Sequence, residues 1–290
     1  MAQNKPYTKS ARRRKFFSSA ASHTLIVILV FIWLIPIVWV TLTAFKKSPG
    51  LSSATFFPTE YTTEHFIQLF KVTSNRNYVR WVLNTLEIAL LNMVLTTFFT
   101  ILTAYTLSRL RFKMRKPLMN ISLILGMFPG FMAMVAIYFI LDLFGLINNK
   151  FSLLLVYVAG AGLGFFTSKG YFDTISSEID DAAKIDGAGQ TRVFFQIFLP
   201  LAKPILVYTA LTAFMSPWND YILAGLILQD TNEMTVAVGL YNMVSTDYGV
   251  VQNFTMFAAG CVLIAIPIVI LYIALQRFMV QGITAGAVKG

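Results

Sequence analysis

The sequence predicts an all-α integral membrane protein, and three observations support this fold class. Apolar residues make up 57% of the 290 positions and charged residues only 12%, which is too apolar a balance for a water-soluble domain. Several uncharged runs reach the ~20 residues that a helix needs to cross a bilayer. Alternating stretches of about ten residues, which an outer-membrane barrel requires, are not evident. Because the bilayer core offers backbone groups no water, the spans should be helices.

Six largely uncharged runs are expected to be transmembrane helices. They cover approximately 24–43, 81–107, 118–141, 151–168, 205–228 and 254–275. Pro129 and Gly130 interrupt the third run, and Pro217 and Pro267 lie in the fifth and sixth. Since a proline removes a helical hydrogen bond, these helices should bend. The bends could serve a pathway that opens and closes, or could be ordinary packing irregularities.

The distribution of basic residues predicts that both chain ends are cytoplasmic. Lys and Arg concentrate on the cytoplasmic side of short loops. With the N-terminus inside, most of the 23 basic residues fall in the N-terminal tail, the segment 109–116, the loop after the fourth run and the C-terminal tail. The net charge of +10 comes from basic residues beside the span ends, where anionic lipid headgroups attract them. A nucleic acid partner is therefore not needed to explain it. The other basic residues fall on the outer side in this topology; they are Lys46, Lys47, Lys71, Arg76, Arg80 and Lys150.

This topology divides the chain into a basic cytoplasmic tail, a membrane domain and a second tail. The tails are 1–23 and 281–290; the six-helix domain is 24–280 and includes a cytoplasmic loop at 169–203. The first run is too long for a signal peptide and lacks a small-residue cleavage site, so it is interpreted as an uncleaved helix.

The chain lacks the usual signatures of an enzyme. No Gly-x-x-x-x-Gly-Lys-Ser/Thr loop is present to hold ATP phosphates. The two histidines, His23 and His65, form no paired metal-ligand motif, and no nucleophile-base set can be assembled. The single cysteine, Cys261, lies in the last run and excludes an intrachain disulfide framework. We therefore expect no catalytic residues, no metal and no cofactor in this chain.

The loop after the fourth run contains a short, well-delimited helix. From position 175 it reads ISSEIDDAAKIDGAGQTRVFFQIFLPLAKP. Ser176 or Ser177 can cap the helix, and Gly187 can end it in a left-handed conformation. Three acids, Glu178, Asp180 and Asp181, complement the positive N-terminal end of the helix dipole. Residues of little bulk recur at helical spacing and so share one face, which consists of Ile179, Ala182, Ala183 and Asp186. A second segment, 193–199, continues through Pro200 into the fifth run. The pattern fits a docking helix or simply a capped loop.

The same loop resembles a known family signature. The residues Asp181, Ala182, Ala183 and Gly187, followed by Ile197 and Leu199-Pro200, resemble the Glu-Ala-Ala…Gly…Ile-x-Leu-Pro motif of binding-protein-dependent importer permeases. Asp181 replaces the usual Glu, which keeps the charge but shortens the reach. TSKGYFDTI before the motif, WNDY in the fifth run and the closing GITAGAVKG extend the resemblance along the chain. They are similar to the smaller, MalG-like subunit of maltose-type carbohydrate permeases.

The resemblance implies a permease subunit of an ATP-binding-cassette importer with the type I, MetI-like fold. The loop would be a coupling helix seated in a cleft of a cytoplasmic ATPase, and the C-terminal tail would reach the same ATPase. The implied coupling residues are Asp181, Ala182, Ala183, Asp186 and Gly187, and the implied tail residues are Gly282, Lys289 and Gly290. Implied partners are a MalF-like second permease, two P-loop ATPase subunits that bind ATP and magnesium, an extracytoplasmic sugar-binding protein and membrane lipid. The substrate would be an oligosaccharide, with malto-oligosaccharides favoured.

Two polar clusters inside the runs are candidates for the substrate path. Polar and ionisable groups within spans usually face an interior or a water-filled cavity. One cluster contains Asn84 and Glu87, with Asn92 on the same arc, and the other is Trp218, Asn219, Asp220 and Tyr221. Their positions near the outer ends of two helices would let them line one cavity and bind sugar hydroxyls and rings. Alternatively, they hold neighbouring helices together.

Two other classes of protein remain possible from the residues alone. In an ion-coupled secondary sugar transporter, Glu87 or Asp220 would carry a proton, although no internal repeat is evident. A membrane scaffold would have no substrate-dependent activity and no requirement for Gly187.

Overall fold

The computed structural model describes residues 9–48 and 56–287, and every regular element within them is a helix. Three helices are long and apolar enough to cross a membrane alone: α1 (Lys9–Ala44), α3 (Tyr78–Arg109) and α14 (Asp247–Ala287). Two helix pairs meet the same length and composition only when each pair is taken together, and each is bent at a short break. α4 (Arg115–Gly126) and α5 (Gly130–Leu143) meet at 98°, and the segment Gln190–Leu201 meets α11 (Lys203–Asn219) at 81°.

Shorter helices complete the described chain. α6 (Lys150–Gly160) is apolar but shorter than a membrane span. The other short elements are α2 (Glu64–Leu69), α7 (Phe166–Asp173), α8 (Glu178–Ile185), α9 (Gln190–Arg192), the π-helix η1 (Val193–Phe198), α10 (Leu199–Leu201), α12 (Ile222–Ile227) and α13 (Val236–Met243). The all-α membrane fold is thus confirmed, and its apolar segments are long, bent or short rather than six helices of full span length.

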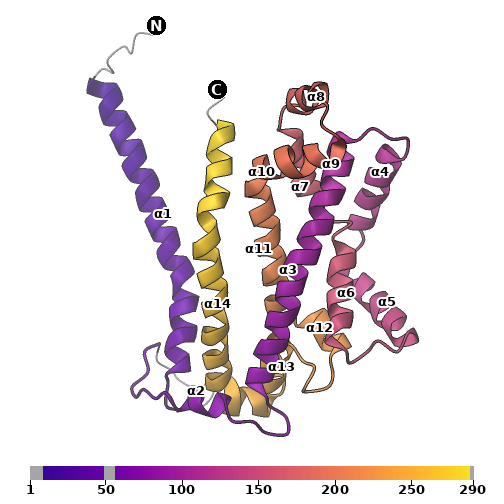
Figure 1. Cartoon of the computed structure of the whole chain (residues 1–290). Coiled ribbons are helices and arrows are strands. Elements are labelled where there is room, and N and C mark those ends of the chain that lie inside the picture. The colour runs from indigo at the N-terminus through magenta and orange to yellow at the C-terminus, as the bar shows by residue number, and fades with distance from the viewer. Residues whose placement is uncertain (1–8, 49–55, 288–290) are drawn as a thin grey trace.

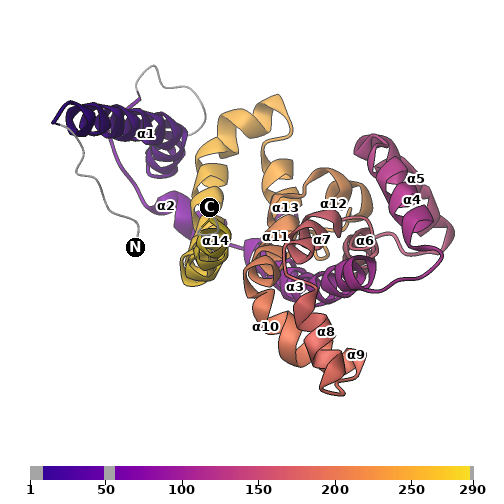
Figure 2. The same cartoon turned by 90° about the horizontal axis from the view of Figure 1, so that it is seen from above.

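The helices form an open bundle with two distinct ends (Figure 1). The start of α1, the end of α14 and the short helix α8 lie at one end, and α2, α12 and α13 lie at the other. We call these the α8 end and the α13 end. Seen from above, α1 and the α4–α5 pair lie on opposite sides of the bundle (Figure 2). α1 meets α14 near Ala44, which packs against Ala258 and Ala259. The apolar residues 25–35 of α1 are exposed.

The core is built around α3, which packs against α6, α7, α11 and α13. Trp81 of α3 is 1% exposed, and its indole Nε1 donates to the carbonyl of Thr231 at 2.8 Å. Its ring lies directly against Gly239 of α13, where a Cβ would overlap the indole. The glycine therefore allows α13 to approach α3 closely.

The fourth and fifth predicted spans are not single helices. The run 151–168 breaks at 161–165, where Gly160, Gly162 and Gly164 lower helix propensity. The run 205–228 breaks at Asp220, whose Oδ1 accepts from the backbone N–H of Leu223 at 3.0 Å and so satisfies a donor in the first turn of α12. The third run breaks around Pro129, as predicted, whereas Pro267 lies within an unbroken α14.

Candidate functional site

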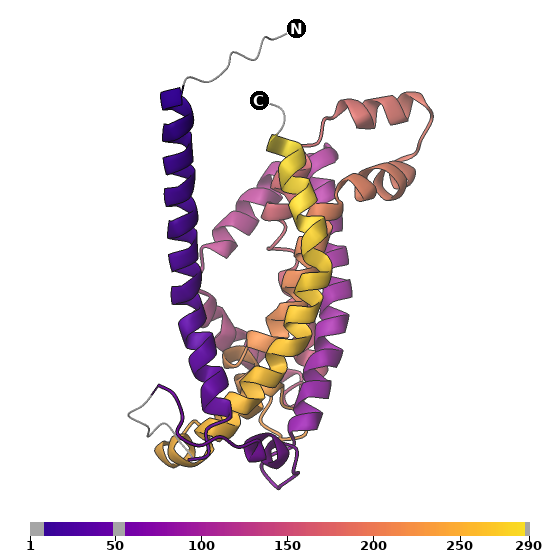
Figure 3. The same ribbon diagram turned by 90° about the vertical axis from the view of Figure 1, so that its left-hand side faces the viewer.

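The short helix α8 projects from the bundle at the α8 end (Figure 3). The backbone N–H of Glu178 donates to the Ser176 hydroxyl at 3.3 Å, although Ser177 occupies the N-cap position. At the other end Gly187 has φ +77°, and the backbone N–H of Ala188 donates to the Ala183 carbonyl at 2.9 Å. The predicted left-handed stop is therefore present, and it confines α8 to about two turns.

The two faces of α8 differ from the predicted face of small residues. Asp180 and Ala183 are buried against the bundle, whereas Asp181, Ala182 and Asp186 are exposed. Ile185 was not singled out from the sequence, and it is 86% exposed at the tip of the helix. The outward face thus combines an acid, a small residue and an exposed aliphatic side chain.

Arg109, the last residue of α3, joins α8 to the bundle. Its terminal guanidinium nitrogen donates to the carbonyls of Phe172 at 2.8 Å and Ile175 at 2.6 Å. Its Nε lies 3.4 Å from Oδ2 of Asp180, and both side chains are only 10% exposed. From the sequence alone, Arg109 is one of several positive charges in the segment 109–116. Its position at the end of an apolar run is the signal that its side chain could contact another segment at the same end of the bundle.

The connection from α8 back into the membrane passes through η1. The Arg109 guanidinium carbon lies 4.9 Å from the centre of the Phe198 ring in this π-helix. Tyr105 of α3 contacts the rings of Phe194 and Phe198 at centroid distances of 4.7 and 5.0 Å. Because η1 leads through α10 into α11, a displacement of α8 has a continuous packed route to two membrane helices.

Asp173, at the end of α7, lies beside the end of α3 that carries Arg109. Its carboxylate accepts from the Ser108 hydroxyl and from Lys169 Nζ, both at 2.6 Å. Burial raises the pKa of Asp173, but these hydrogen bonds outweigh it and leave the pKa below its ordinary value.

The predicted tail residues lie partly outside the described structure. Gly282 is in the last turns of α14, at the same end as α8 (Figure 1). Lys289 and Gly290 lie outside the described residues.

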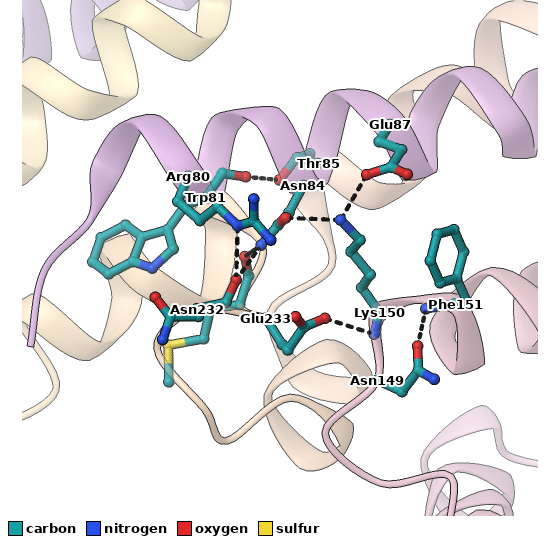
Figure 4. A network of polar contacts seen from close by, with 11 residues as sticks. Arg80, Trp81, Asn84, Thr85, Glu87, Asn149, Lys150, Phe151, Asn232 and Glu233 are labelled. Carbon is teal, nitrogen blue, oxygen red and sulfur yellow. Dashed lines mark hydrogen bonds and ion pairs between the residues drawn. The ribbon is translucent and has the colours of Figure 1, made fainter.

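At the α13 end, the predicted residues Asn84 and Glu87 belong to a polar network centred on Lys150 (Figure 4). The Asn84 amide donates to the carbonyls of Asn232 at 2.7 Å and Met234 at 3.1 Å. Lys150 Nζ donates to Asn84 Oδ1 at 3.1 Å and forms an ion pair with Glu87 Oε2 at 2.6 Å. Asn84 is 1% exposed, so in this structure it holds α3, α6 and the segment 232–234 together.

The second predicted cluster, at the end of α11, has its side chains in separate surroundings. Trp218 is 2% exposed and packs against Phe214, and Asn219 is exposed and donates to the Met215 carbonyl at 3.1 Å. Asp220 Oδ2 accepts from the Tyr157 hydroxyl at 2.7 Å, and Tyr221 lies against Tyr241 with ring centroids 4.7 Å apart. Lys150 and Tyr157 are both on α6, so this helix contacts both predicted clusters.

A polar cavity of about 330 Å³ lies between α3, α6, α7 and α11, and none of these predicted candidates except Asn92 lines it. Its lining includes Asn92, Thr96 and Thr100 of α3, Ser168 of α7, and Thr212 and Ser216 of α11. Sequence reasoning missed these hydroxyls. The signal that could have found them is the four-residue spacing of Tyr208, Thr212 and Ser216 inside an apolar run.

Comparisons with known proteins agree with this architecture. Residues 96–285 match the family described as the inner membrane component of binding-protein-dependent transport systems. The chain is 36% identical over 278 residues to the galactooligosaccharides transport system permease protein GanQ of Bacillus subtilis, covering 96% of this chain and 98% of that protein. It is also 36% identical over 282 residues to the maltodextrin transport system permease protein MdxG of the same organism, covering 97% and 100%.

A solved structure has the same fold. A chain from a bacterial ABC transporter involved in the import of the acidic polysaccharide alginate matches with a TM-score of 0.74 at 22% identity, covering 95% of this chain and 99% of that one. The similarity extends over nearly the whole chain, so the arrangement of helices described above is a known fold.

Proposed function

This chain belongs to the family of inner membrane components of binding-protein-dependent transport systems, and we propose that it is the permease subunit of an ATP-driven importer of oligosaccharides. Family membership makes it a multi-pass protein of the bacterial cytoplasmic membrane and a member of the MalG-type group expected from its sequence. The relatives named for galactooligosaccharide and maltodextrin transport support a saccharide substrate, and maltodextrins are the finer proposal.

The observation that carries the proposal is the projecting helix α8. It is short, ends at the left-handed Gly187, is exposed on one face and is tied to the bundle on the other through Asp180 and Arg109. These properties suit a coupling helix that docks on a separate ATPase through Asp181, Ala182 and Ile185. Gly187 keeps it short, and Asp186 lies on the exposed edge beside it.

The proposed topology places the α8 end in the cytoplasm, with the start of α1 and the end of α14. Gly282 and the tail beyond it would then approach the ATPase. The α13 end would face the extracytoplasmic binding protein, and a second, MalF-like permease would complete the path. This chain would hydrolyse nothing, since ATP and magnesium would be bound by the partner ATPase.

In this mechanism, closure of the ATPase on ATP moves α8, and Arg109 and η1 pass the movement to α3 and α11. The bundle then switches between inward-facing and outward-facing states. Ion-coupled transport, the alternative from the sequence, would require Glu87 or Asp220 to exchange protons. Glu87 is paired with Lys150, and Asp220 accepts from Tyr157, so each carboxyl has a structural partner.

The test is co-purification of the chain and its partners from the native membrane in mild detergent. The unaltered chain should bring a second permease and a P-loop ATPase. Ile185→Asp should lose the ATPase while keeping the second permease, because it puts a charge at the exposed tip of α8. The matched control is Ile67→Asp, on α2 at the opposite end, where Ile67 is 60% exposed.

Recovery of the unaltered chain without any ATPase would contradict the proposed function. Equal recovery of the ATPase with both variants would be consistent with an importer but would contradict the assignment of α8 as its docking helix.

A further inference from the structure

The surface of α11 carries a polar stripe in the middle of a membrane span. Tyr208, Thr212 and Ser216 lie four residues apart and are all exposed, with the exposed Asn219 three residues further on. Residues at this spacing share one face of a helix. A face turned toward lipid would carry apolar residues at these positions, because hydrocarbon offers hydroxyl groups no partner.

Tyr208, Thr212 and Ser216 of this stripe form one wall of the 330 Å³ cavity, and the other walls combine hydroxyl and amide groups with glycine and alanine. Asn92, Thr96 and Thr100 line it from α3. Gly160, the last residue of α6, and Gly164, between α6 and α7, also line it; a Cβ at Gly160 would meet nothing within 4 Å. The volume is within the range of about 300–1,000 Å³ typical of small-molecule sites.

Several of these hydroxyls have spare hydrogen-bonding capacity. In the part of the chain that the structure describes, the side chains of Thr100, Thr167, Tyr208 and Ser216 make no hydrogen bond. By contrast, Thr96 donates to Asn92 Oδ1 at 2.6 Å, and Thr212 donates to the Tyr208 carbonyl at 3.0 Å while its lone pairs remain available. The cavity therefore offers both donors and acceptors to whatever enters it.

The charge of the lining favours a neutral ligand. Among the described residues that line the cavity, none is Asp, Glu, Lys, Arg or His. The adjacent ionisable group is the Asp220 carboxyl, which accepts from the cavity-lining Tyr157. A uronic acid would need a basic partner to replace its hydration, whereas hydroxyl, amide and aromatic groups match a neutral sugar.

We propose that this cavity is a saccharide contact surface on the translocation path, built for neutral rather than acidic oligosaccharides. The proposal rests on the oligosaccharide-import function above and adds the site and its charge preference. It identifies Thr212 and Ser216 as side chains that bind sugar hydroxyls during passage.

The first test is protection of an introduced cysteine in the purified complex without its binding protein. In a Cys261→Ala background, the Thr212→Cys variant should react with a charged, hydrophilic methanethiosulfonate. Maltotetraose or a galactose tetrasaccharide, at about four times its dissociation constant, should slow the reaction about fivefold, because only unoccupied sites react. A mannuronate tetrasaccharide should not slow it. The matched control is Thr41→Cys on α1, where Thr41 likewise bonds to the carbonyl four residues earlier and no sugar should change the rate.

The second test is uptake by the reconstituted complex. Thr212→Val keeps the shape of the side chain, and with Ser216→Ala it should lower tetrasaccharide uptake about fivefold while the ATPase still co-purifies. Thr41→Val should leave uptake unchanged.

Failure of the cavity proposal can be told apart from failure of the function. If the unaltered complex imports a tetrasaccharide but the Thr212→Cys variant is unreactive, unprotected, or equally protected by mannuronate, the cavity proposal is overturned alone. If the unaltered complex contains no ATPase and imports nothing, the function itself fails.

Discussion

The two ends of α3 each hold a basic side chain in a polar network, but the networks have different designs. At the α13 end, Lys150 joins Glu87 and Asn84, and Asn84 in turn bonds two backbone carbonyls of the segment 232–234. At the α8 end, Arg109 bonds two carbonyls at the end of α7 and faces Asp180 on a projecting helix. The first network fastens packed segments together, whereas the second connects the bundle to an exposed one. We infer that the first maintains the fold and the second transmits movement.

The largest effect is expected from Arg109→Gln. It removes the partner of the Asp180 carboxyl and of two backbone carbonyls, all at a site with little solvent exposure. Removing one partner of a buried ion pair costs about 3–5 kcal/mol of folding free energy. Because α8 would lose its attachment to α3, sugar uptake per ATP hydrolysed should fall at least about tenfold in proteoliposomes. The control is Arg192→Gln, at the same end, where Arg192 bonds only Gln196 one turn away on the surface. An unchanged ratio in a folded Arg109→Gln complex would contradict the transmitting role.

Asn84→Ala should have the next largest effect, and on stability rather than coupling. It removes two hydrogen bonds to backbone carbonyls from a fully buried site, which amounts to about 2 kcal/mol. The melting temperature of the purified complex should fall, while uptake per ATP hydrolysed stays the same. Asn219→Ala is the matched control for melting, since Asn219 is exposed and bonds only within its own helix. A normal melting temperature with altered coupling would reverse the proposed division between the two ends.

A smaller loss of stability is expected from Lys150→Met. The Lys150 side chain is 11% exposed but its partner Glu87 is 45% exposed, so solvent screening limits the pair to about 1 kcal/mol. The melting temperature should fall by less than with Asn84→Ala, and Lys113→Met, on an exposed surface, should not lower it. A larger loss than that of Asn84→Ala would show that the ion pair, not the amide, holds the α13 end.

The smallest effect concerns Asp173 and pH. Its folded pKa is depressed by hydrogen bonds from Lys169 and Ser108 against the opposing effect of burial. The resulting stability is present above the ordinary aspartate pKa and is lost as pH falls through the lower, folded value. Asp173→Asn should therefore melt slightly below the unaltered chain at neutral pH, with the difference shrinking on acidification. A difference that grows on acidification would contradict the direction of the shift.

The sequence predicted the membrane class, the break at Pro129 and the Gly187 stop of α8, because each depends on local composition or backbone preference. It did not predict the break at 161–165, where three spaced glycines occur. It predicted a bend in the fifth run at Pro217, but Pro217 lies inside α11 and the break comes at Asp220, whose carboxylate accepts from the backbone of the next helix.

The candidate site was predicted less completely than the fold. The motif located α8 but not its orientation. The orientation depends on the contact between Asp180 and Arg109, which lies 71 positions earlier in the chain. Asn84 and Trp218 are polar or aromatic residues in apolar runs, and only their burial shows that they pack. The hydroxyl cavity is assembled from four helices, so no single run revealed it.

The most direct test of the central claim is cross-linking from the tip of α8 in the native membrane. In a Cys261→Ala background, Ile185→Cys would carry a short thiol-reactive photo-cross-linker, and Ile67→Cys would carry the same reagent at the opposite end. We predict that the Ile185→Cys product contains a P-loop ATPase and that the Ile67→Cys product does not. Cross-linking of the Ile185→Cys variant only to lipid, to itself or to an extracytoplasmic protein would contradict the assignment of α8 as the coupling helix.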